Sequence, residues 1–322
     1  MPRDTEHVVI YTGKTVNQNG RSQLGEDFPL AHGWYKANLR FKIVVTIGTA
    51  TGAITNGELN IIKNILFRTD KGETICDLPG RALYNIATVK AGTTARKDAI
   101  AAASATYLVN IPLYFADERM IRPEDTILDT ARYNSVTLDV TYGGVADLFT
   151  TPGTASLVVT SDFEVYRTSD VLPEEALPIA FPSYEVEPTS DPNSKTFIDM
   201  SRDINMSVKR MYVHTASGAT AGQPFSGTND DGVIDVVSLK DHNSSIIQDR
   251  VYEMVQDGNK EDYSLESVVS GLMVFDFVRD GSSLSSLYTG DLSKLQLTWT
   301  NDSGVAANDQ VSIARESLRA LV

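Results

Sequence analysis

The sequence has little of the chemistry on which enzymes and metal proteins depend. Its 322 residues include one cysteine, Cys76, and four histidines, His7, His32, His214 and His242. A single cysteine cannot form an intramolecular disulfide. No two histidines have the H-x-x-x-H spacing that places two zinc ligands on one face of a helix. We therefore expect no zinc site, and interpret Cys76 as a small buried hydrophobic residue rather than a nucleophile.

Catalytic motifs are missing as well. The chain contains no G-x-S-x-G elbow, no glycine-rich phosphate loop followed by Lys-Ser or Lys-Thr, and no Cys-x-x-Cys. A glycosidase needs two carboxylates set about 5–10 Å apart across a cleft. With 42 Asp and Glu residues, some pair meets that condition by chance. The sequence thus predicts a protein that is not an enzyme, with no catalytic residues and no cofactor-binding residues.

Positive charge is also scarce. Lys and Arg number 28 against 42 Asp and Glu, which gives a net charge of −14. We therefore expect no direct binding to nucleic acid, because affinity for nucleic acid comes mostly from Lys and Arg side chains that neutralise phosphates. The longest apolar runs fall far short of the ~20 residues that span a bilayer, and no secretory leader is recognisable. We expect synthesis as a soluble product in a cytoplasm.

Two segments contain clustered oxygen ligands that could form calcium sites on loops. They are Asn229–Gly232 and Asp257–Asn259. Calcium binds several such oxygens, but the spacing does not match the twelve-position helix-loop-helix pattern, and Asp-Gly and Asn-Asp strings are ordinary turns. Turns are the preferred interpretation, so the metal ligands stay unknown and structural calcium is the single cofactor considered.

Aromatic residues offer one alternative function. Tyr133, Tyr142, Phe277 and Trp299 could line a sugar site if the chain were a two-domain carbohydrate-binding or adhesin-like β-sandwich protein. At strand positions such residues more often pack in the core or between barrels. A polysaccharide-active enzyme is a third interpretation.

What the sequence does contain is an internal repeat with three landmarks in the same order. The segment NIIKNILFRT at 60–69 resembles MSVKRMYVHT at 206–215, and the four residues from Leu83 resemble the four from Val251. VTLDVT at 136–141 resembles LQLTWT at 295–300. The number of residues that separates the two members of a pair differs from one pair to the next. Such differences are expected, because loops tolerate insertions whereas packed elements do not. The repeat predicts two tandem domains, which the length also allows.

The chain divides accordingly. We expect an N-terminal arm at 1–33, a first barrel at 34–168, a linker at 169–183 that contains Pro173, Pro178 and Pro182, and a second barrel at 184–322 with a long exposed loop at 216–232. Helices are predicted at 78–89 and 245–255, and a helix or mobile loop at 93–106. Short strands separated by Gly, Pro, Asn and Asp predict an all-β chain of two tandem jelly-roll β-sandwich domains, with a few short helices in the connections.

Two such β-units in an acidic chain without catalytic motifs resemble the double jelly-roll major capsid proteins of tailless, membrane-containing icosahedral bacteriophages and related viruses. The segments NIIKNILFRTDKGETICDLPG and IPLYFADERMIRPEDTILDT resemble the smaller phage members of this family. The total length is close to that of the capsid protein of lipid-containing flavobacterial phages. The resemblance covers most of 34–322.

The resemblance implies a structural virion protein, made in the bacterial host cytoplasm. It implies a homotrimer whose six barrels form a pseudo-hexagonal tile, with lateral contacts to other capsomers. Further partners would be other capsid, penton or spike proteins. The arm would contact the internal viral membrane, where Arg3, Lys14 and Arg21 could meet lipid phosphates.

Overall fold

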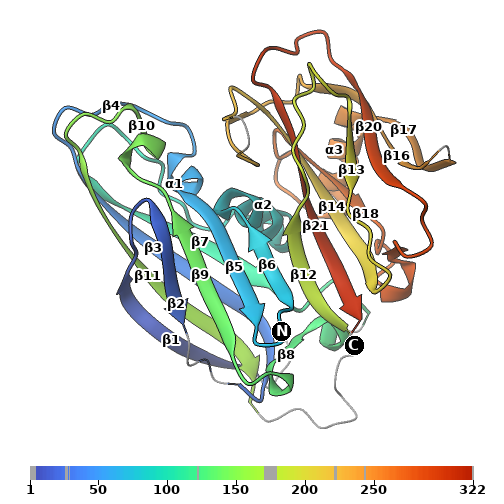
Figure 1. Cartoon of the computed structure of the whole chain (residues 1–322), viewed down its shortest axis with the longest axis horizontal. Helices are drawn as coiled ribbons and strands as arrows, with labels where there is room; N and C mark the ends of the chain where they lie inside the picture. Colours follow the sequence, from blue (N-terminus) through green and yellow to red (C-terminus); the bar gives the residue numbers. More distant parts are fainter. Residues whose placement is uncertain are drawn as a thin grey trace. The chain divides into compact units, whose positions relative to one another are not determined.

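The computed structural model describes residues 5–25, 28, 30–121, 123–169, 180–220, 223–242 and 244–320. Apart from the last two residues, the chain forms two compact units. The first comprises Met1–Thr88 and Thr94–Pro182, and the second comprises Val89–Thr93 and Ser183–Ala320 (Figure 1). Each unit is built mainly of β-strands, and each is described by itself.

The first unit contains two sheets. One has the strand order β1-β11-β3-β7, and the other has the order β6-β5-β9-β2. A short ribbon joins β10 to β4, and β8 pairs with the start of β3. The strands are β1 (Thr5–Thr15), β2 (Gly20–Gly25), β3 (Gly33–Thr46), β4 (Thr51–Ala53), β5 (Ile62–Thr69), β6 (Thr74–Leu78), β7 (Ala105–Tyr114), β8 (Leu128–Asp129), β9 (Val136–Tyr142), β10 (Phe149–Thr151) and β11 (Ser156–Thr168).

Short helices connect these strands. They are α1 (Gly57–Asn60), α2 (Gly80–Ala91), and the 3-10 helices η1 (Pro123–Thr126), η2 (Thr130–Arg132) and η3 (Val145–Asp147). The expected helix at 78–89 corresponds to α2. Its start directly after Pro79 suits proline, which lacks the N–H that the first turn leaves unpaired in any case.

The two sheets of the first unit pack face to face because their strands alternate. In β3, Leu39, Phe41 and Ile43 are buried, whereas Arg40 and Lys42 between them are exposed. The core is rich in aromatic rings that meet at centroid distances of 5.4–6.2 Å, among them Phe28, Trp34, Phe67, Phe115 and Phe163. Such pairs stabilise by about 0.5–1.5 kcal/mol each beyond the burial of their area.

The second unit repeats this arrangement. One sheet contains β15-β14-β21-β12, with β18 and β19 also paired to β14, and the other has the order β13-β20-β16-β17. The elements are β12 (Ala180–Val186), β13 (Phe197–Met200), β14 (Met206–Ser217), β15 (Thr228–Asn229), β16 (Ile234–Asp241), β17 (Ser244–Val251), α3 (Tyr252–Asp262), β18 (Leu272–Asp276), η5 (Ser283–Ser285), β19 (Leu287–Tyr288), β20 (Leu295–Asn301) and β21 (Gln310–Ala320).

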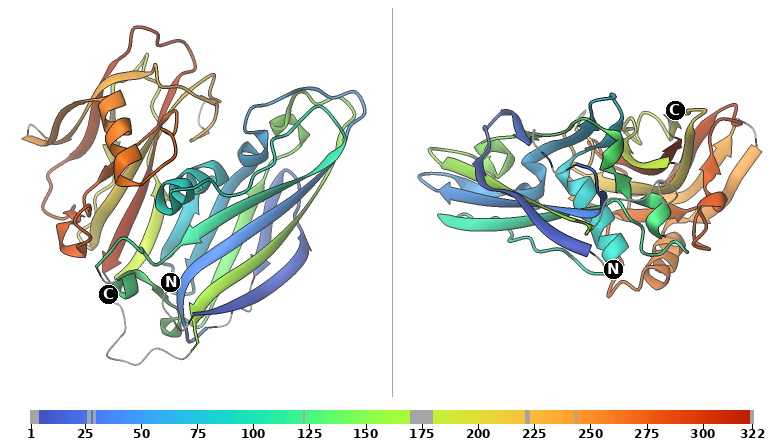
Figure 2. Two further views of the ribbon diagram at one scale, coloured as in Figure 1. Left: turned by 180° about the vertical axis from the view of Figure 1, so that it is seen from behind. Right: turned by 90° about the horizontal axis from the view of Figure 1, so that it is seen from below.

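The core of the second unit is mainly aliphatic. Buried side chains from β14, β16, β20 and β21 form one cluster, which includes Met211, Val237, Leu297 and Ile313. Figure 2 shows α3, drawn in orange, packed against the strands of this unit. Strand order and helix position therefore correspond between the units: α2 follows β6 and precedes β7, as α3 follows β17 and precedes β18.

Several expected boundaries differ from the structure. Residues expected as an arm contribute β1 and β2, which pair with β11 and β9 inside the first unit. The segment 93–106 contains no helix; most of it is irregular until β7 begins at Ala105. The helix expected at 245–255 begins at Tyr252, because Ser244–Val251 pairs with β16 as a strand.

The structure also bears on the two expected connecting segments, the linker at 169–183 and the loop at 216–232. Most of the proline-rich linker, 170–179, lies outside the described residues. The loop expected at 216–232 begins at the end of β14 and includes β15, and its Phe225 is buried rather than exposed. Of the helices that the structure describes, none is both long enough and apolar enough to cross a membrane.

Candidate functional site

The residues with the most reactive side chains lie on different strands, namely β6, β14 and β1. Cys76 is fully buried in β6, with its Sγ 3.5 Å from the Ile65 carbonyl oxygen. His214 is buried in β14, where its Nε2 lies 3.0 Å from Asn229 Oδ1, whereas His7 pairs with Glu164 on β11. No group of three or more His, Cys, Asp or Glu side chains that could hold a metal occurs among the described residues.

The two acidic segments considered for calcium have other partners. Asp230 Oδ1 accepts a hydrogen bond from the Gly232 amide at 2.9 Å, which makes this segment a turn. Asp231 Oδ1 accepts from the Gly271 amide and from Gln256 Nε2, both at 2.7 Å. The segment Asp257–Asn259 is not a loop, because it lies within α3. Neither segment presents a set of converging oxygens.

The aromatic residues considered for a sugar site are mostly interior. Tyr133, Tyr142 and Trp299 are buried, and Phe277 is partly buried against the core of the second unit. Burial raises the pKa of the Tyr142 phenol far above its ordinary value, as expected for a hydroxyl removed from water. These rings pack the two cores and do not form an exposed platform.

The basic residues expected to meet lipid are engaged within the first unit. Lys14 Nζ donates to the Leu24 carbonyl oxygen at 2.9 Å, and Arg21 forms an ion pair with Asp139. Arg3 lies outside the described residues.

The second unit contains a buried cluster of charges that the sequence did not reveal. Glu316 Oε1 accepts from Lys90 Nζ and Lys209 Nζ, each at 2.8 Å, and Glu316 Oε2 accepts from the Tyr212 hydroxyl at 3.0 Å. Arg210 lies 3.4 Å from the same carboxylate. Burial, with Glu316 as the next cause, raises the pKa of Tyr212 well above its ordinary value, so the phenol stays protonated and donates.

This cluster extends through Arg210. Its Nε lies 3.0 Å from Asp276 Oδ2, which also accepts from the Tyr263 hydroxyl at 2.6 Å. The carboxylates and cations neutralise one another in the interior, and the cluster thus joins β14, β18 and β21 of the second unit. Asp276 also lines a hollow at the surface of this unit.

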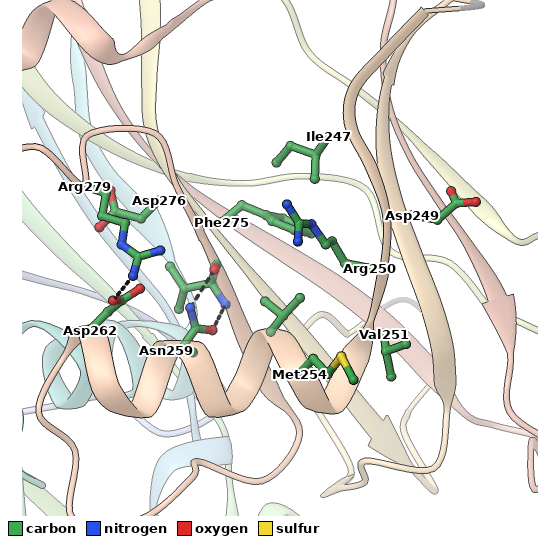
Figure 3. A pocket seen from close by; sticks show the side chains of 13 residues that line it. Ile247, Asp249, Arg250, Val251, Met254, Asn259, Asp262, Phe275, Asp276 and Arg279 are labelled. Atoms are coloured by element: carbon green, nitrogen blue, oxygen red, sulfur yellow. Dashed lines mark hydrogen bonds and ion pairs between the residues drawn. The ribbon is translucent and has the colours of Figure 1, made fainter.

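The surface of the second unit carries an open hollow of about 500 Å³ between β17, α3 and β18. Figure 3 shows Ile247 and Phe275 on its apolar wall, with the ion pair of Asp262 and Arg279 at one end. Met254, on α3 at the rim, is 72% exposed. An apolar hollow beside an exposed methionine is typical of a surface that contacts another protein.

Comparison with known proteins gives matches at the level of structure. No family model matches the chain, and no curated protein matches its sequence. The crystal structure of the major capsid protein of Sulfolobus turreted icosahedral virus matches with a TM-score of 0.68 at 13% identity, over 98% of this chain and 97% of that chain.

Other viral capsid proteins also match over nearly the full length of this chain. Protein P2, the major capsid protein of bacteriophage PM2, matches with a TM-score of 0.61 at 11% identity, over 99% of this chain and 98% of that one. The Faustovirus major capsid protein matches with a TM-score of 0.59 at 10% identity, over 99% and 91%. The chain therefore has, along its whole length and in both units, the double jelly-roll fold of these viral major capsid proteins.

Proposed function

We propose that the chain is the major capsid protein of an icosahedral virus, which acts by self-association and has no enzymatic activity. The observation that carries the proposal is the match to capsid proteins over nearly the full length of both chains. A match confined to one jelly-roll unit would fit many proteins, because that fold hosts unrelated functions. A match to two units in the same order fits far fewer.

The two-unit chain suits a hexagonal lattice. Three copies of a chain with two similar units present six similar sides, so that a threefold trimer meets six neighbours with little strain. We infer that the protein forms homotrimers, and that trimers make lateral contacts in a shell. Penton, spike and other capsid proteins are the further partners, and the location is the virion.

The negative charge of the chain supports the same function. A net charge of −14 keeps a concentrated subunit soluble before assembly and repels the phosphates of a genome. The part of the proposal in which the shell encloses a membrane rests on the family resemblance of the sequence. The engagement of Lys14 and Arg21 within the first unit gives the lipid contact of the N-terminal segment no added support.

The alternative, a two-domain carbohydrate-binding or adhesin-like protein, predicts an exposed aromatic platform. The rings considered for that role are buried or partly buried, so no observation favours it.

Solution mass tests the proposal. We expect size-exclusion chromatography with light scattering to give a particle of about three times the 35.1 kDa chain mass. Electron microscopy of concentrated protein should then show hexagonal sheets or shells. A monomer at high concentration, together with binding to an immobilised glycan, would overturn the proposal in favour of the alternative.

A further inference from the structure

We propose that the face formed by β17 and α3 in the second unit is the docking surface for a second copy of this chain, and that the copy covers it with the β1 edge of its first unit. The inference rests on the proposed self-association and adds which two surfaces meet. Three independent features carry it: burial, open sheet edges and charge.

The two units differ in how the same structural position is covered. In the first unit, every residue of 80–88 in α2 is buried, as are Ile75, Cys76 and Leu78 of the preceding strand β6. In the second unit, the corresponding helix α3 exposes Met254 and its neighbours, and β17 exposes Gln248–Val251. When the same position is buried in one unit of a repeat and exposed in the other, the exposed surface is expected to bind another protein.

The bare position includes a sheet edge that has no further strand beside it among the described residues. Strand β17 is the last strand of its sheet, with β16 on one side only, and β1 is likewise the last strand of its sheet beside β11. Both edges expose apolar side chains, since Val251 is 38% exposed and Val9 is 53% exposed. Open edges of this kind associate with other strands unless they are blunted or covered.

The two edges are unlike, because they end different sheets in different units. Strand β1 opens the order β1-β11-β3-β7 in the first unit, and β17 ends the order β13-β20-β16-β17 in the second unit. Each chain thus offers one edge of each kind. A contact between unlike surfaces is heterologous, and it generates a closed ring when the rotation between copies closes.

The distribution of charge between the two units favours the first unit, rather than the second, as the surface that contacts α3 of another copy. Residues 1–168 contain 17 Lys and Arg against 18 Asp and Glu, whereas residues 169–322 contain 11 against 24. The exposed acids Glu253, Asp257 and Glu261 lie four residues apart along α3 and so share one face. The sheet of the first unit presents the basic side chains of Lys36, Arg40 and Lys42 on its outward face.

Second units brought face to face would oppose like charges, which costs several kcal/mol, whereas the almost neutral first unit has no such penalty. The charge distribution therefore disfavours a twofold contact between α3 faces and favours the head-to-tail contact of α3 and β17 with β1.

Two charge insertions with matched controls test the assignment. Met254→Lys places a cation on the α3 face, and Ile204→Lys is its control, since the two residues are 72% and 70% exposed in the same unit. Val9→Lys changes the β1 edge, and Val158→Lys is its control at 54% exposure on the adjacent strand. Circular dichroism confirms that each variant is folded.

We expect wild type and both controls to form trimers, and Met254→Lys and Val9→Lys to raise the dissociation constant at least tenfold. Mixing the last two should restore one intact contact and give a 1:1 dimer, because one partner keeps its α3 face and the other keeps its β1 edge.

The outcomes separate the inference from the proposed function. Trimers that persist in Met254→Lys or Val9→Lys, an equal loss in the controls, or a mixture that stays monomeric would each overturn the surface assignment while self-association stands. A wild-type protein that is monomeric at high concentration would overturn the proposed function itself.

Discussion

Lys209 Nζ and Glu316 Oε1 lie 2.8 Å apart in the interior of the second unit, where both side chains are essentially inaccessible to water. The two residues come from neighbouring strands, β14 and β21. A buried ion pair is tolerated when further hydrogen bonds satisfy the remaining atoms, and Glu316 receives them from Tyr212 and Lys90. The second unit is thus organised around a carboxylate as well as around apolar side chains.

We expect Glu316→Gln to lower the free energy of unfolding by about 3 kcal/mol, because it leaves the buried cations without their shared counter-ion. Urea unfolding followed by circular dichroism measures the change. Asp199→Asn is the control: Asp199 pairs with Lys294 at 3.1 Å with both side chains more than two-fifths exposed, so a loss of less than about 1 kcal/mol is expected. Equal losses in the two variants would contradict the structural role of Glu316.

The pH dependence of stability should reflect Glu164 on β11. Burial alone would raise its pKa, but hydrogen bonds from Asn38 and His7 and the charge of Arg40 outweigh burial, and the pKa lies below its ordinary value. A carboxyl with a lowered pKa in the folded state stabilises fully above its unfolded pKa and loses that contribution as the pH falls through the folded value.

Glu164→Gln should therefore lower the free energy of unfolding by about 1–2 kcal/mol at pH 7, with a smaller difference from wild type at pH 3. Urea titrations at a series of pH values measure both. Glu118→Gln, which changes an exposed carboxyl, should leave the profile unchanged. A wild-type minus Glu164→Gln difference that is constant with pH would show that Glu164 has no such role.

The repeat that predicted the fold was correct in two landmarks and wrong in one. The pair from Leu83 and Val251 falls on α2 and on the junction of β17 and α3, and the pair from Val136 and Leu295 falls on β9 and β20, which hold the same position in their sheets. The first pair aligned β5 with β14, although β5 lies between β6 and β9 and so corresponds in strand order to β16, which lies between β17 and β20. Strands β5 and β14 have similar apolar patterns, and a pattern of that kind does not encode which strands a strand pairs with.

Other features depended on contacts far apart in the chain. The side chains that contact Glu316 belong to Lys90, Lys209, Arg210 and Tyr212. No local sequence pattern indicates that they lie together. The segment 245–255 was expected as a helix because the repeat made it the counterpart of 78–89, but Ser244–Val251 pairs with β16 as a strand. The segment 1–33 was expected as an arm, because the pairing of β1 with β11 joins residues about 150 positions apart and could not be inferred from the local sequence.

Gly271 should not tolerate a side chain. Its φ is +67°, and a Cβ there would lie 2.5 Å from the Thr215 carbonyl oxygen. Gly72 has a φ of +81° with no atom within 4 Å of a Cβ, so it isolates the cost of the left-handed backbone. We expect Gly72→Ala to lose about 1 kcal/mol and Gly271→Ala about 3 kcal/mol, as backbone strain and the clash combine. Equal losses by urea unfolding would contradict the close approach at Gly271.

Asp231 should stabilise the second unit without a metal. Its Oδ1 already accepts hydrogen bonds from Gly271 and Gln256, so the carboxylate joins the loop after β15 to α3 and to the start of β18. We expect Asp231→Ala to lower the free energy of unfolding by about 2 kcal/mol, because two buried donors lose their acceptor.

Thermal unfolding of wild type in EDTA and in millimolar calcium should give the same midpoint, because Asp231 is engaged by protein donors and the neighbouring Asp230 closes its own turn. Asp257→Ala, on the exposed face of α3, is the control for removing a carboxylate and should change stability little. A midpoint that rises with calcium in wild type but not in Asp231→Ala would instead place a cation at this carboxylate, and the hydrogen bonds to Gly271 and Gln256 would have to give way to it.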